Sequence, residues 1–535
     1  MSRFIFITGG VVSSLGKGVT SASIGRLLIS RGLRIRMLKL DPYLNVDPGT
    51  MSPFQHGEVF VTDDGGETDL DLGHYERYTG LPTSKKSNRT AGQVYWEVLS
   101  KERRGDYLGR TIQMIPHITD EIKSAIRALA EPEVDIVLVE IGGTVGDIEG
   151  LTFLEAIRQI GLEEGRDNAM YLHLTYVPFI RAAGELKTKP SQQSVAKLRE
   201  IGIVPDALIC RTEVPIPDEA RRKLSLFCNV PVPAVLEERD VAHSIYEIPL
   251  MLHEQGLDEL ILVHFRLARP PARLNEWRAM VEAVSKPQRI ARIGVVGKYS
   301  ELQDAYKSLY EALTHGGIPH RAGVEVVRIA AEDIEKAGAE RALAGVDGLL
   351  VPGGFGQRGI EGKVEAIRWA RVHGLPFLGI CLGLQCAVIE YARHVCGLAG
   401  AHSTEIEKAA PHPVVCLMEE QTKVQGMGGT MRLGAFPCAL TEDSLASKLY
   451  GARRISERHR HRYEVNNDYR ARLETAGLRI SGVSPDGSLV EIIEVPGHPF
   501  FIATQAHPEF KSQPMAPHPL FQGLVGAALA HKDRA

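Results

Sequence analysis

The sequence predicts an α/β protein with two doubly wound domains, each built on a mostly parallel sheet. Its 535 residues exceed the length of one ordinary domain. Short β-branched runs alternate with longer amphipathic stretches throughout, which is typical of βαβ units. One interruption, containing Pro270 and Pro271, separates two series of such units.

Strand-like runs occur in both halves of the chain. In the first half they cover residues 4–8, 35–40, 135–141, 171–177 and 207–211, and in the second half 292–297, 324–329, 348–351 and 376–380. The interruption lies at residues 266–274, and a helical stretch at about 277–284 follows it. We therefore predict a first domain at residues 1–267, a linker at 268–288 and a second domain at 289–535.

The overall composition argues against several classes of function. Hydrophobic residues make up 44% and charged residues 24%, an ordinary balance for a globular protein. The net charge of -4 gives no support for a nucleic acid polymer as partner. No apolar run approaches the roughly 20 residues of a membrane helix, and the N-terminus has no signal-peptide pattern. Seven cysteines without CxxC pairs indicate thiols in a reducing compartment, so we expect a cytoplasmic enzyme.

The first strand-like run ends in a glycine-rich turn between Thr8 and Thr20. Glycines let backbone amides approach phosphate oxygens, the following helix offers its positive end, and Lys17 adds a charge. The strict phosphate-loop pattern is not met, because Gly18 stands where Ser or Thr would ligate magnesium. Such a turn also occurs as a simple connection, but the Gly-Lys step and the helix after it favour nucleotide binding. Magnesium must then be held by other groups.

Carboxylates are candidates for that role. Glu140 ends an apolar run, and the carboxyl end of a buried parallel strand is where α/β folds bind ligands. Asp71 lies in an acidic stretch with Asp63, Asp64 and Glu67. Oxygen ligands of this type suit magnesium, although a solvated acidic loop is the alternative interpretation of residues 63–71.

A second chemical signal is the pattern G-x-C-x-G around Cys381, directly after an apolar run. Flanking glycines permit a sharp strand-to-helix turn, and a helix N-terminus favours the reactive thiolate. A lone cysteine after a strand is more often a small buried apolar residue, but the two glycines favour a nucleophile here. Cys386 and Cys396 have no such setting, and we interpret them as structural.

A thiol nucleophile needs a base and a group that orients the base. His507 and Glu509 stand two residues apart after another apolar run, and they could serve as this pair. The glycines of residues 352–356 could present backbone amides to a developing oxyanion. Together these motifs predict acyl transfer by a cysteine that hydrolyses an amide.

Three of these motifs, Pro352-Gly-Gly354, Gly379-Ile-Cys381-Leu-Gly383 and His507-Pro-Glu509, resemble the class I glutamine amidotransferases. Long runs of the first half are similar to the CTP synthase family. These runs lie at residues 9–18, 39–53, 55–61, 68–77, 141–149 and 187–190, so the resemblance extends along nearly the whole chain.

The resemblance implies an ATP- and UTP-binding amidoligase (synthase) domain followed by a class I glutaminase domain. ATP would phosphorylate O4 of UTP, and ammonia from glutamine would displace the phosphate to give CTP. The implied catalytic residues of the glutaminase are Cys381, His507 and Glu509. The implied ATP-binding residues are Ser14, Leu15, Gly16, Lys17, Gly18, Val19, Asp71, Arg239, Asp240 and Val241, with Asp71 and Glu140 holding Mg²⁺.

The same resemblance assigns the other substrates. The implied UTP site, which would also receive CTP as inhibitor, consists of Ser13, Asp147, Ile148, Glu149, Lys187, Thr188, Lys189, Pro190, Ser191, Gln192 and Lys223. A solvated basic loop is the alternative for Lys187 and Lys189. The implied glutamine-binding residues are Gly354, Leu382, Gly383, Leu384, Gln385, Glu405 and Arg462.

Further properties follow only from the family. Its members are homotetramers, GTP activates glutamine hydrolysis, and an internal ammonia passage begins near the counterpart of His56. One departure from the family pattern is a connection at residues 418–428 that looks shorter than usual.

Two other functions are compatible with these motifs. A related ATP-dependent amidoligase could aminate another acceptor, such as a corrin carboxylate, but the segments at 146–149 and 187–190 would then need another purpose. A catalytically silent, nucleotide-sensing assembly protein is the second alternative. The intact Cys381, His507, Glu509 and Lys17 argue against it.

Overall fold

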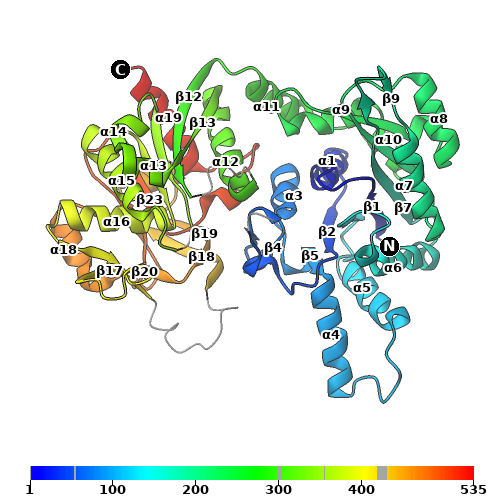
Figure 1. The fold of residues 1–535 in the computed structure, drawn as a ribbon, viewed down its shortest axis with the longest axis horizontal. Helices are drawn as coiled ribbons and strands as arrows, with labels where there is room; N and C mark the ends of the chain where they lie inside the picture. Colours follow the sequence, from blue (N-terminus) through cyan, green and yellow to red (C-terminus); the bar gives the residue numbers. More distant parts are fainter. Residues whose placement is uncertain (1, 53–55, 299–303, 355, 418–430, 535) are drawn as a thin grey trace. The chain divides into compact units, whose positions relative to one another are not determined.

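The structure is a computed structural model that describes residues 2–52, 56–298, 304–354, 356–417 and 431–534. The chain forms two compact units (Figure 1). Unit 1 comprises Met1–Pro48 and Asp71–Val281, and unit 2 comprises Gly49–Leu70 and Glu282–Ala535.

The domain limits expected at residues 267 and 289 stay a prediction. The grouping of residues 49–70 with unit 2 was not foreseen from the sequence. The connection at 418–428 lies outside the described residues.

Unit 1 is built on a seven-stranded sheet in the order β11-β10-β7-β1-β6-β2-β5, in which every neighbouring pair is parallel. The strands are β1 (Arg3–Gly9), β2 (Ile35–Asp41), β5 (Asn88–Thr90), β6 (Ile136–Ile141), β7 (Ala169–Tyr176), β10 (Ala207–Thr212) and β11 (Val235–Arg239). Four successive apolar residues of β1, from Phe4 to Ile7, are at most 3% exposed. A continuous apolar run of this kind is expected for a strand that is covered on both faces.

Helices cover both faces of this sheet. On one face, α4 (Ala91–Arg104), α5 (Thr119–Arg127) and α6 (Leu151–Glu164) share a core with Phe4, Phe6, Val137 and Val139. On the other face, α1 (Lys17–Ser30) packs against β1, β2 and β6 and against α3 (Asp71–Thr79) and α9 (Ile248–Glu254). The remaining elements are α7 (Lys189–Glu200), α8 (Asp218–Cys228), α10 (Leu257–His264) and the short pair β8 (Phe179–Ile180) and β9 (Glu185–Leu186).

The helix expected after the proline-containing interruption is α11 (Asn275–Ser285). Its Trp277 is fully buried, and the indole nitrogen donates a hydrogen bond of 2.9 Å to the carbonyl of Tyr246. The first turns of α11 are therefore part of the core of unit 1.

Unit 2 contains a nine-stranded sheet in the order β13-β12-β14-β15-β23-β22-β21-β18-β19. The first five strands of this order pair in parallel and the others continue the sheet in antiparallel fashion. The strands are β12 (Arg289–Gly297), β13 (Ala322–Ala330), β14 (Gly348–Val351), β15 (Phe377–Ile380), β18 (Arg432–Leu440), β19 (Arg454–His461), β21 (Arg479–Val483), β22 (Val490–Glu494) and β23 (Phe501–Thr504).

Two hydrophobic cores lie on opposite faces of the unit 2 sheet. Adjacent strand residues such as Val295 and Val296 belong to different cores, as the side-chain alternation of a strand requires. One core contains α13 (Ala331–Ala337), α14 (Ala339–Ala342), α15 (Ile360–His373) and α16 (Leu382–His394). The other contains α12 (Lys307–Gly317), α17 (Leu445–Tyr450) and α19 (Pro519–Lys532).

Smaller elements complete unit 2. They are α18 (Arg470–Thr475), the sheet of β16 (Ala401–Ser403), β17 (His412–Leu417) and β20 (Tyr463–Val465), and the hairpin of β3 (Phe60–Val61) and β4 (Glu67–Thr68).

The predicted fold class is confirmed, and each of the nine predicted strands coincides with an observed one. The antiparallel extension of the unit 2 sheet was not predicted. Among the described residues, no helix is both long enough and apolar enough to span a bilayer.

Candidate functional site

Cys381 occupies a strained turn between β15 and α16. Its φ of 51° lies in the left-handed region that side chains rarely adopt. Its amide donates to the carbonyl of Thr504 at 2.7 Å, and its carbonyl accepts from the amides of Leu384 and Gln385. A Cβ on Gly383 would lie 2.1 Å from the carbonyl oxygen of Val351, and one on Gly379 would lie 2.9 Å from Cβ of Ala503. The turn therefore requires both flanking glycines, as the pattern G-x-C-x-G predicted.

His507 and Glu509 follow β23, the strand next to β15. Nδ1 of His507 lies 2.7 Å from Oε1 of Glu509. A Cβ on Gly353 would lie 2.7 Å from Cε1 of His507 and 3.5 Å from Cβ of Cys381, so both side chains flank this glycine. Within the described part of the chain, Nε2 of His507 is buried and makes no hydrogen bond. The three predicted residues are thus brought together, with one imidazole nitrogen held by the carboxylate and the other left for proton transfer.

The electrostatics of this group favour a protonated imidazole. Burial lowers the pKa of His507, but the negative charges of Glu509 and of a Cys381 thiolate outweigh burial and raise the pKa to about 10. Below that value the imidazolium can stabilise a thiolate beside it. Burial raises the pKa of Cys386 to about 11, in agreement with a structural role for that cysteine.

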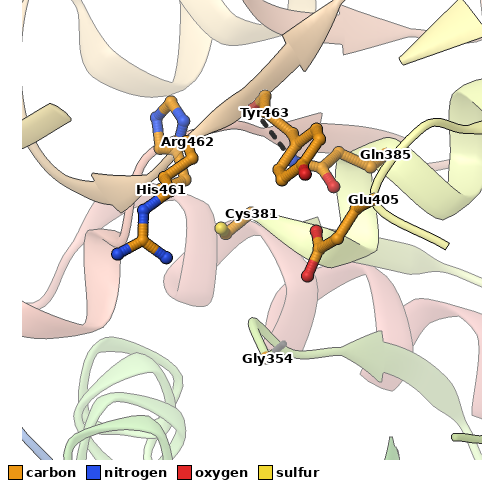
Figure 2. A pocket seen from close by; sticks show the side chains of 7 residues that line it. All are labelled: Gly354, Cys381, Gln385, Glu405, His461, Arg462 and Tyr463. Carbon is orange, nitrogen blue, oxygen red and sulfur yellow. Dashed lines mark hydrogen bonds between the residues drawn. The ribbon is translucent and has the colours of Figure 1, made fainter. Parts of the chain in front are cut away.

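A pocket with about 300 Å³ of empty space, part of it open to solvent, lies beside Cys381. It is lined by Gly354, Cys381, Gln385, Glu405, His461, Arg462 and Tyr463. Figure 2 shows the guanidinium of Arg462 and the carboxylate of Glu405 on opposite sides of the Cys381 sulfur. A cation and an anion on either side of a thiol suit a ligand that carries both charges, as a free amino acid does.

The predicted glutamine-binding residues occupy two layers of this site. Gly354, Gln385, Glu405 and Arg462 line the pocket, whereas Leu382, Gly383 and Leu384 are buried in the first turn of α16. The side-chain amide of Gln385 donates to the carbonyl of Tyr463 at 3.1 Å (Figure 2). The carboxylate of Glu405 accepts from the backbone amide of Gly356 at 3.1 Å. These bonds fix the two sides of the pocket before a ligand binds.

A buried polar cluster lies behind the pocket. Arg432 donates to Glu464 at 3.2 Å and to Glu491 at 2.6 Å, and Nδ1 of His459 lies 2.9 Å from Nε2 of His461. All five side chains are buried. Burial raises the pKa of Glu464 to about 8 despite the neighbouring Arg432. Of this strand and its surroundings, the sequence predicted only Arg462 as a site residue, and the cluster was not foreseen.

The glycine-rich turn of unit 1 has the backbone expected for a phosphate-binding loop. Val11, Ser14 and Gly16 have positive φ, and α1 begins at Lys17. Nζ of Lys17 donates to the carbonyl of Gly143 at 2.7 Å. Burial lowers the pKa of Lys17, and the nearby Lys39 adds to this effect. Ser13 and Ser14 are exposed, Leu15 is buried, and Gly18 and Val19 lie in the first turn of α1.

Asp71 fills the position next to Gly18 where a phosphate loop would carry a hydroxyl. A Cβ on Gly18 would lie 1.8 Å from Oδ1 of Asp71. Nζ of Lys39 contacts both Asp71 and Glu140, the second at 2.7 Å, and the hydroxyl of Tyr75 donates to Glu140 at 2.5 Å. The two predicted metal ligands are therefore brought together. Two carboxylates beside a phosphate-binding loop form a donor set that fits Mg²⁺.

The predicted residue Arg239 ends β11, and Asp240 and Val241 follow it, close to the glycine-rich loop. Arg211 links this segment to α1. Its guanidinium lies 2.7 Å from the carboxylate of Asp240 and 3.2 Å from that of Glu238. Glu238 in turn accepts a hydrogen bond from the hydroxyl of Thr20 in α1. Burial raises the pKa of Glu238 to about 7.

The predicted UTP residues lie on three loop segments, which contain Ser13, Asp147–Glu149 and Lys187–Thr188, and on helices α7 and α8. Asp147, Ile148 and Glu149 are exposed beside a pocket with about 190 Å³ of empty space between the ends of β1 and β6. Thr188, Ser191 and Gln192 are buried and shape the start of α7, where Pro190 occupies the first turn. The ammonium groups belong to exposed residues, namely Lys187, Lys189 and Lys223. Lys187 pairs with Glu185 while both side chains stay exposed, so the alternative of a solvated basic loop stays open.

Sequence reasoning missed Lys39 and Arg211 as members of the unit 1 site. Lys39 is 5% exposed within a strand that is otherwise largely apolar. A lysine in such a run needs a buried counter-charge, which is a signal that the sequence does contain. Arg211 gave a weaker signal, because it stands at a strand end where exposed arginines are common.

Each half of the chain matches a known protein family. The family model described as CTP synthase N-terminus matches residues 3–267, and glutamine amidotransferase class-I matches residues 301–527. The chain is 57% identical over 530 residues to the CTP synthase of Caldanaerobacter subterraneus, covering 99% of this chain and 98% of the relative. It is 58% identical to the CTP synthase of Rubrobacter xylanophilus, covering 100% and 97%. The glutaminase domain of Trypanosoma brucei CTPS with bound acivicin is 40% identical over 45% of this chain and 94% of that chain, with a TM-score of 0.43.

Proposed function

The chain belongs to the CTP synthase family of glutamine-hydrolysing ligases, and we propose how its two sites divide the reaction between them. The glutaminase site of unit 2 releases ammonia from glutamine. The nucleotide site of unit 1 transfers the γ-phosphoryl group of ATP to O4 of UTP. Ammonia then attacks C4 and displaces phosphate, which gives CTP, ADP and phosphate.

In the glutaminase step, the Cys381 thiolate attacks the carboxamide carbon of glutamine. The imidazolium of His507 gives its proton to the departing ammonia, and a glutamyl thioester remains on Cys381. Neutral His507 then takes a proton from water, which hydrolyses the thioester to glutamate. The 2.7 Å contact between Nδ1 of His507 and Glu509 supports this assignment, because it directs Nε2 away from the carboxylate.

Recognition of glutamine is assigned to the two charges of the pocket. Arg462 pairs with the α-carboxylate, and Glu405 pairs with the α-ammonium group. The backbone of Gly354 supplies an amide to the oxyanion that forms on the carboxamide oxygen.

In the nucleotide step, Lys17 and the amides of residues 14–19 hold the ATP phosphates. Lys17 stabilises the transferred phosphoryl group, because its ammonium can stay close to the negative charge that develops on the phosphoryl oxygens. Asp71 and Glu140 would hold Mg²⁺, which supplies positive charge to the phosphate oxygens. The segment Arg239–Val241 contacts the adenine.

The UTP site is assigned to Ser13, Asp147–Glu149, Lys187–Gln192 and Lys223, and CTP competes there as inhibitor. The lysines give the triphosphate its counter-charges. The assignment of GTP as activator of glutamine hydrolysis follows the family resemblance.

A homotetramer is also proposed. Exposed apolar side chains on α4 and the segment after it support an association surface: Trp96 is 68% exposed, Leu99 58% and Leu108 89%. The cytoplasmic location stays a prediction.

One observation carries the proposal: a single chain contains both the Cys381–His507–Glu509 group and the Gly18–Asp71 arrangement beside a phosphate-binding loop. The test is CTP formation from UTP, ATP and Mg²⁺, measured by absorbance with glutamine or ammonia as nitrogen donor. We expect CTP with both donors. Protein that binds ATP and hydrolyses glutamine but forms no CTP with either donor would favour another acceptor. Protein that binds nucleotides but hydrolyses no glutamine would favour the silent assembly protein.

A further inference from the structure

Residues 56–70 belong by sequence to the part of the chain that matches the CTP synthase N-terminus, yet they fold with unit 2. They form the β3–β4 hairpin, whose tip docks on β18. The amide of Ala435 donates to the carbonyl of Asp63 at 2.9 Å. A Cβ on Gly434 would lie 2.7 Å from that same carbonyl oxygen, and one on Gly65 would lie 2.9 Å from the carbonyl oxygen of Leu433. The fit leaves no space for side chains at these two glycines.

The hairpin holds a buried arginine that contacts the candidate triad. Arg458 is 2% exposed, and its Nε donates to Oδ1 of Asp63 at 2.6 Å. Its carbonyl accepts from the amide of His507 at 2.7 Å, and its Nη1 donates to the carbonyl of Phe510 at 3.3 Å. Arg458 therefore makes hydrogen bonds to both ends of the turn that carries His507 and Glu509, and the carboxylate of Asp63 holds the Arg458 side chain in place.

An aromatic contact reaches the same turn from the same hairpin. Phe60 is fully buried and meets Phe510 edge to face, with ring centroids 5.3 Å apart. Phe510 in turn stacks on the imidazole of His507, with centroids 5.3 Å apart and planes inclined by 21°. The hydrogen bond to Glu509 fixes one atom of the imidazole but leaves the ring able to pivot about it. The stack against Phe510 fixes its plane.

We propose that residues 56–70 are a positioning segment for His507, acting through Asp63 on Arg458 and through Phe60 on Phe510. This inference rests on the proposed role of His507 in glutamine hydrolysis. Asp63 and Phe60 are positioning residues, because their described contacts reach the turn and not the glutamine pocket. Their removal lowers the fraction of enzyme in which Nε2 faces Cys381, and it leaves the pocket charges of Arg462 and Glu405 in place.

A second ion pair of the same segment provides a matched control. Nε of Arg460 donates to Oε1 of Glu67 at 2.8 Å, and its Nη2 donates to the carbonyl of Gly49 at 3.0 Å. The bond to Glu67 ties the same segment to the same strand, two residues after Arg458, and the bond to Gly49 reaches a residue that precedes the segment. Neither of these two bonds involves the turn at 507–510.

The experiment compares Asp63→Asn and Phe60→Leu with Glu67→Gln in the full-length enzyme. Asp63→Asn and Glu67→Gln each remove one carboxylate charge with little change of volume. For Asp63→Asn and Phe60→Leu we expect kcat of glutamine hydrolysis to fall about tenfold, with KM for glutamine changed by less than about twofold. For Glu67→Gln we expect kcat within about twofold of wild type. Ammonia-driven CTP formation should persist in all three variants, which shows that they fold.

A readout independent of turnover is the alkylation of Cys381 by iodoacetamide as a function of pH, with Cys381→Ala as background. Loss of the imidazolium partner should move the midpoint of alkylation upward in Asp63→Asn and Phe60→Leu, and not in Glu67→Gln. Unchanged midpoints in both variants, or equal shifts in all three, would overturn the inference. Wild-type protein that hydrolyses no glutamine would overturn the proposed function instead, and the alkylation profiles would still decide the positioning role.

Discussion

Gly18 and Asp71 lie so close together that a Cβ on the glycine would be 1.8 Å from the carboxylate oxygen Oδ1. The carboxylate occupies the space that a Ser or Thr side chain fills in an ordinary phosphate loop. This exchange explains why the loop lacks its hydroxyl residue and why an acidic residue 53 positions later completes the site.

Gly18→Ser should therefore displace Asp71. We expect CTP formation from ammonia and from glutamine to fall by at least about 100-fold, because a displacement of about 1 Å at the reacting groups has effects of that size. Basal glutamine hydrolysis should persist. The control is Ser23→Ala in the same helix, whose hydroxyl bonds only to the carbonyl of Val19 among its described contacts. Normal CTP formation by Gly18→Ser would contradict the assigned role of Asp71.

Cys381→Ala should abolish CTP formation from glutamine and leave formation from ammonia within about twofold of wild type. Only the nitrogen source is lost, since the nucleotide site belongs to unit 1. Parallel assays with the two donors measure this, with Cys386→Ala as a control that keeps both activities. Equal loss with both donors would refute the division of the reaction between the units.

Lys17→Ala should lose both routes to CTP, by about 1,000-fold or more, because the transferred phosphoryl group loses its cation. None of the described residues that line the pocket beside Cys381 belongs to this loop, so basal glutamine hydrolysis should survive. Assays of glutamate release and of CTP on the same preparation separate the two effects. CTP formation at the wild-type rate would exclude the phosphate-loop assignment.

The pH dependence of glutamine hydrolysis should report the charge on His507. Its pKa is about 10 because the charges of Glu509 and Cys381 outweigh burial, so the imidazolium persists as the pH rises to that value. Glu509→Gln removes one of these charges, and the pKa of His507 must fall. We expect the alkaline loss of kcat to begin at lower pH in Glu509→Gln, and kcat at its optimum to fall about 100-fold. An unshifted alkaline limb would show that Glu509 does not set this pKa.

Arg432→Met should destabilise unit 2 by about 3–5 kcal/mol at pH 9, because above the pKa of Glu464 it leaves two buried carboxylates without their cation. Urea unfolding followed by the fluorescence of Trp369, the one tryptophan of unit 2, measures this change. The control is Arg453→Met, which breaks the exposed pair with Glu442, and it should cost less than about 1 kcal/mol. Equal effects of the two variants would show that the cluster is not an important source of stability.

The elements that the sequence predicted best are those whose signal is local. The buried strands are continuous apolar runs, and the turn at Cys381 requires glycines at fixed positions, so both could be read from neighbouring residues. The pairing of His507 with Glu509 could be predicted for the same reason, since the two residues are only two positions apart. The predicted metal ligands Asp71 and Glu140 are also brought together, although this needed a fold in which the start of α3 meets the end of β6.

Contacts between distant segments could not be predicted in this way. The acidic stretch at 63–71 left two interpretations open, a solvated loop or metal ligands. The structure instead pairs Asp63 with Arg458 and Glu67 with Arg460, almost 400 residues later in the chain. No local pattern distinguishes these two carboxylates from Asp71, because their partners are fixed only by the packing of the hairpin on β18 and β19.

Residues 49–70 are encoded within the first half of the chain but complete the packing of the second. A gene divided at the proline-containing connection would therefore separate this hairpin from the unit in which it packs. A fragment of residues 289–535 would leave Arg458 without Asp63 and Phe510 without Phe60. A chimaera that takes its glutaminase from a relative would keep these two contacts only if the hairpin were exchanged with it.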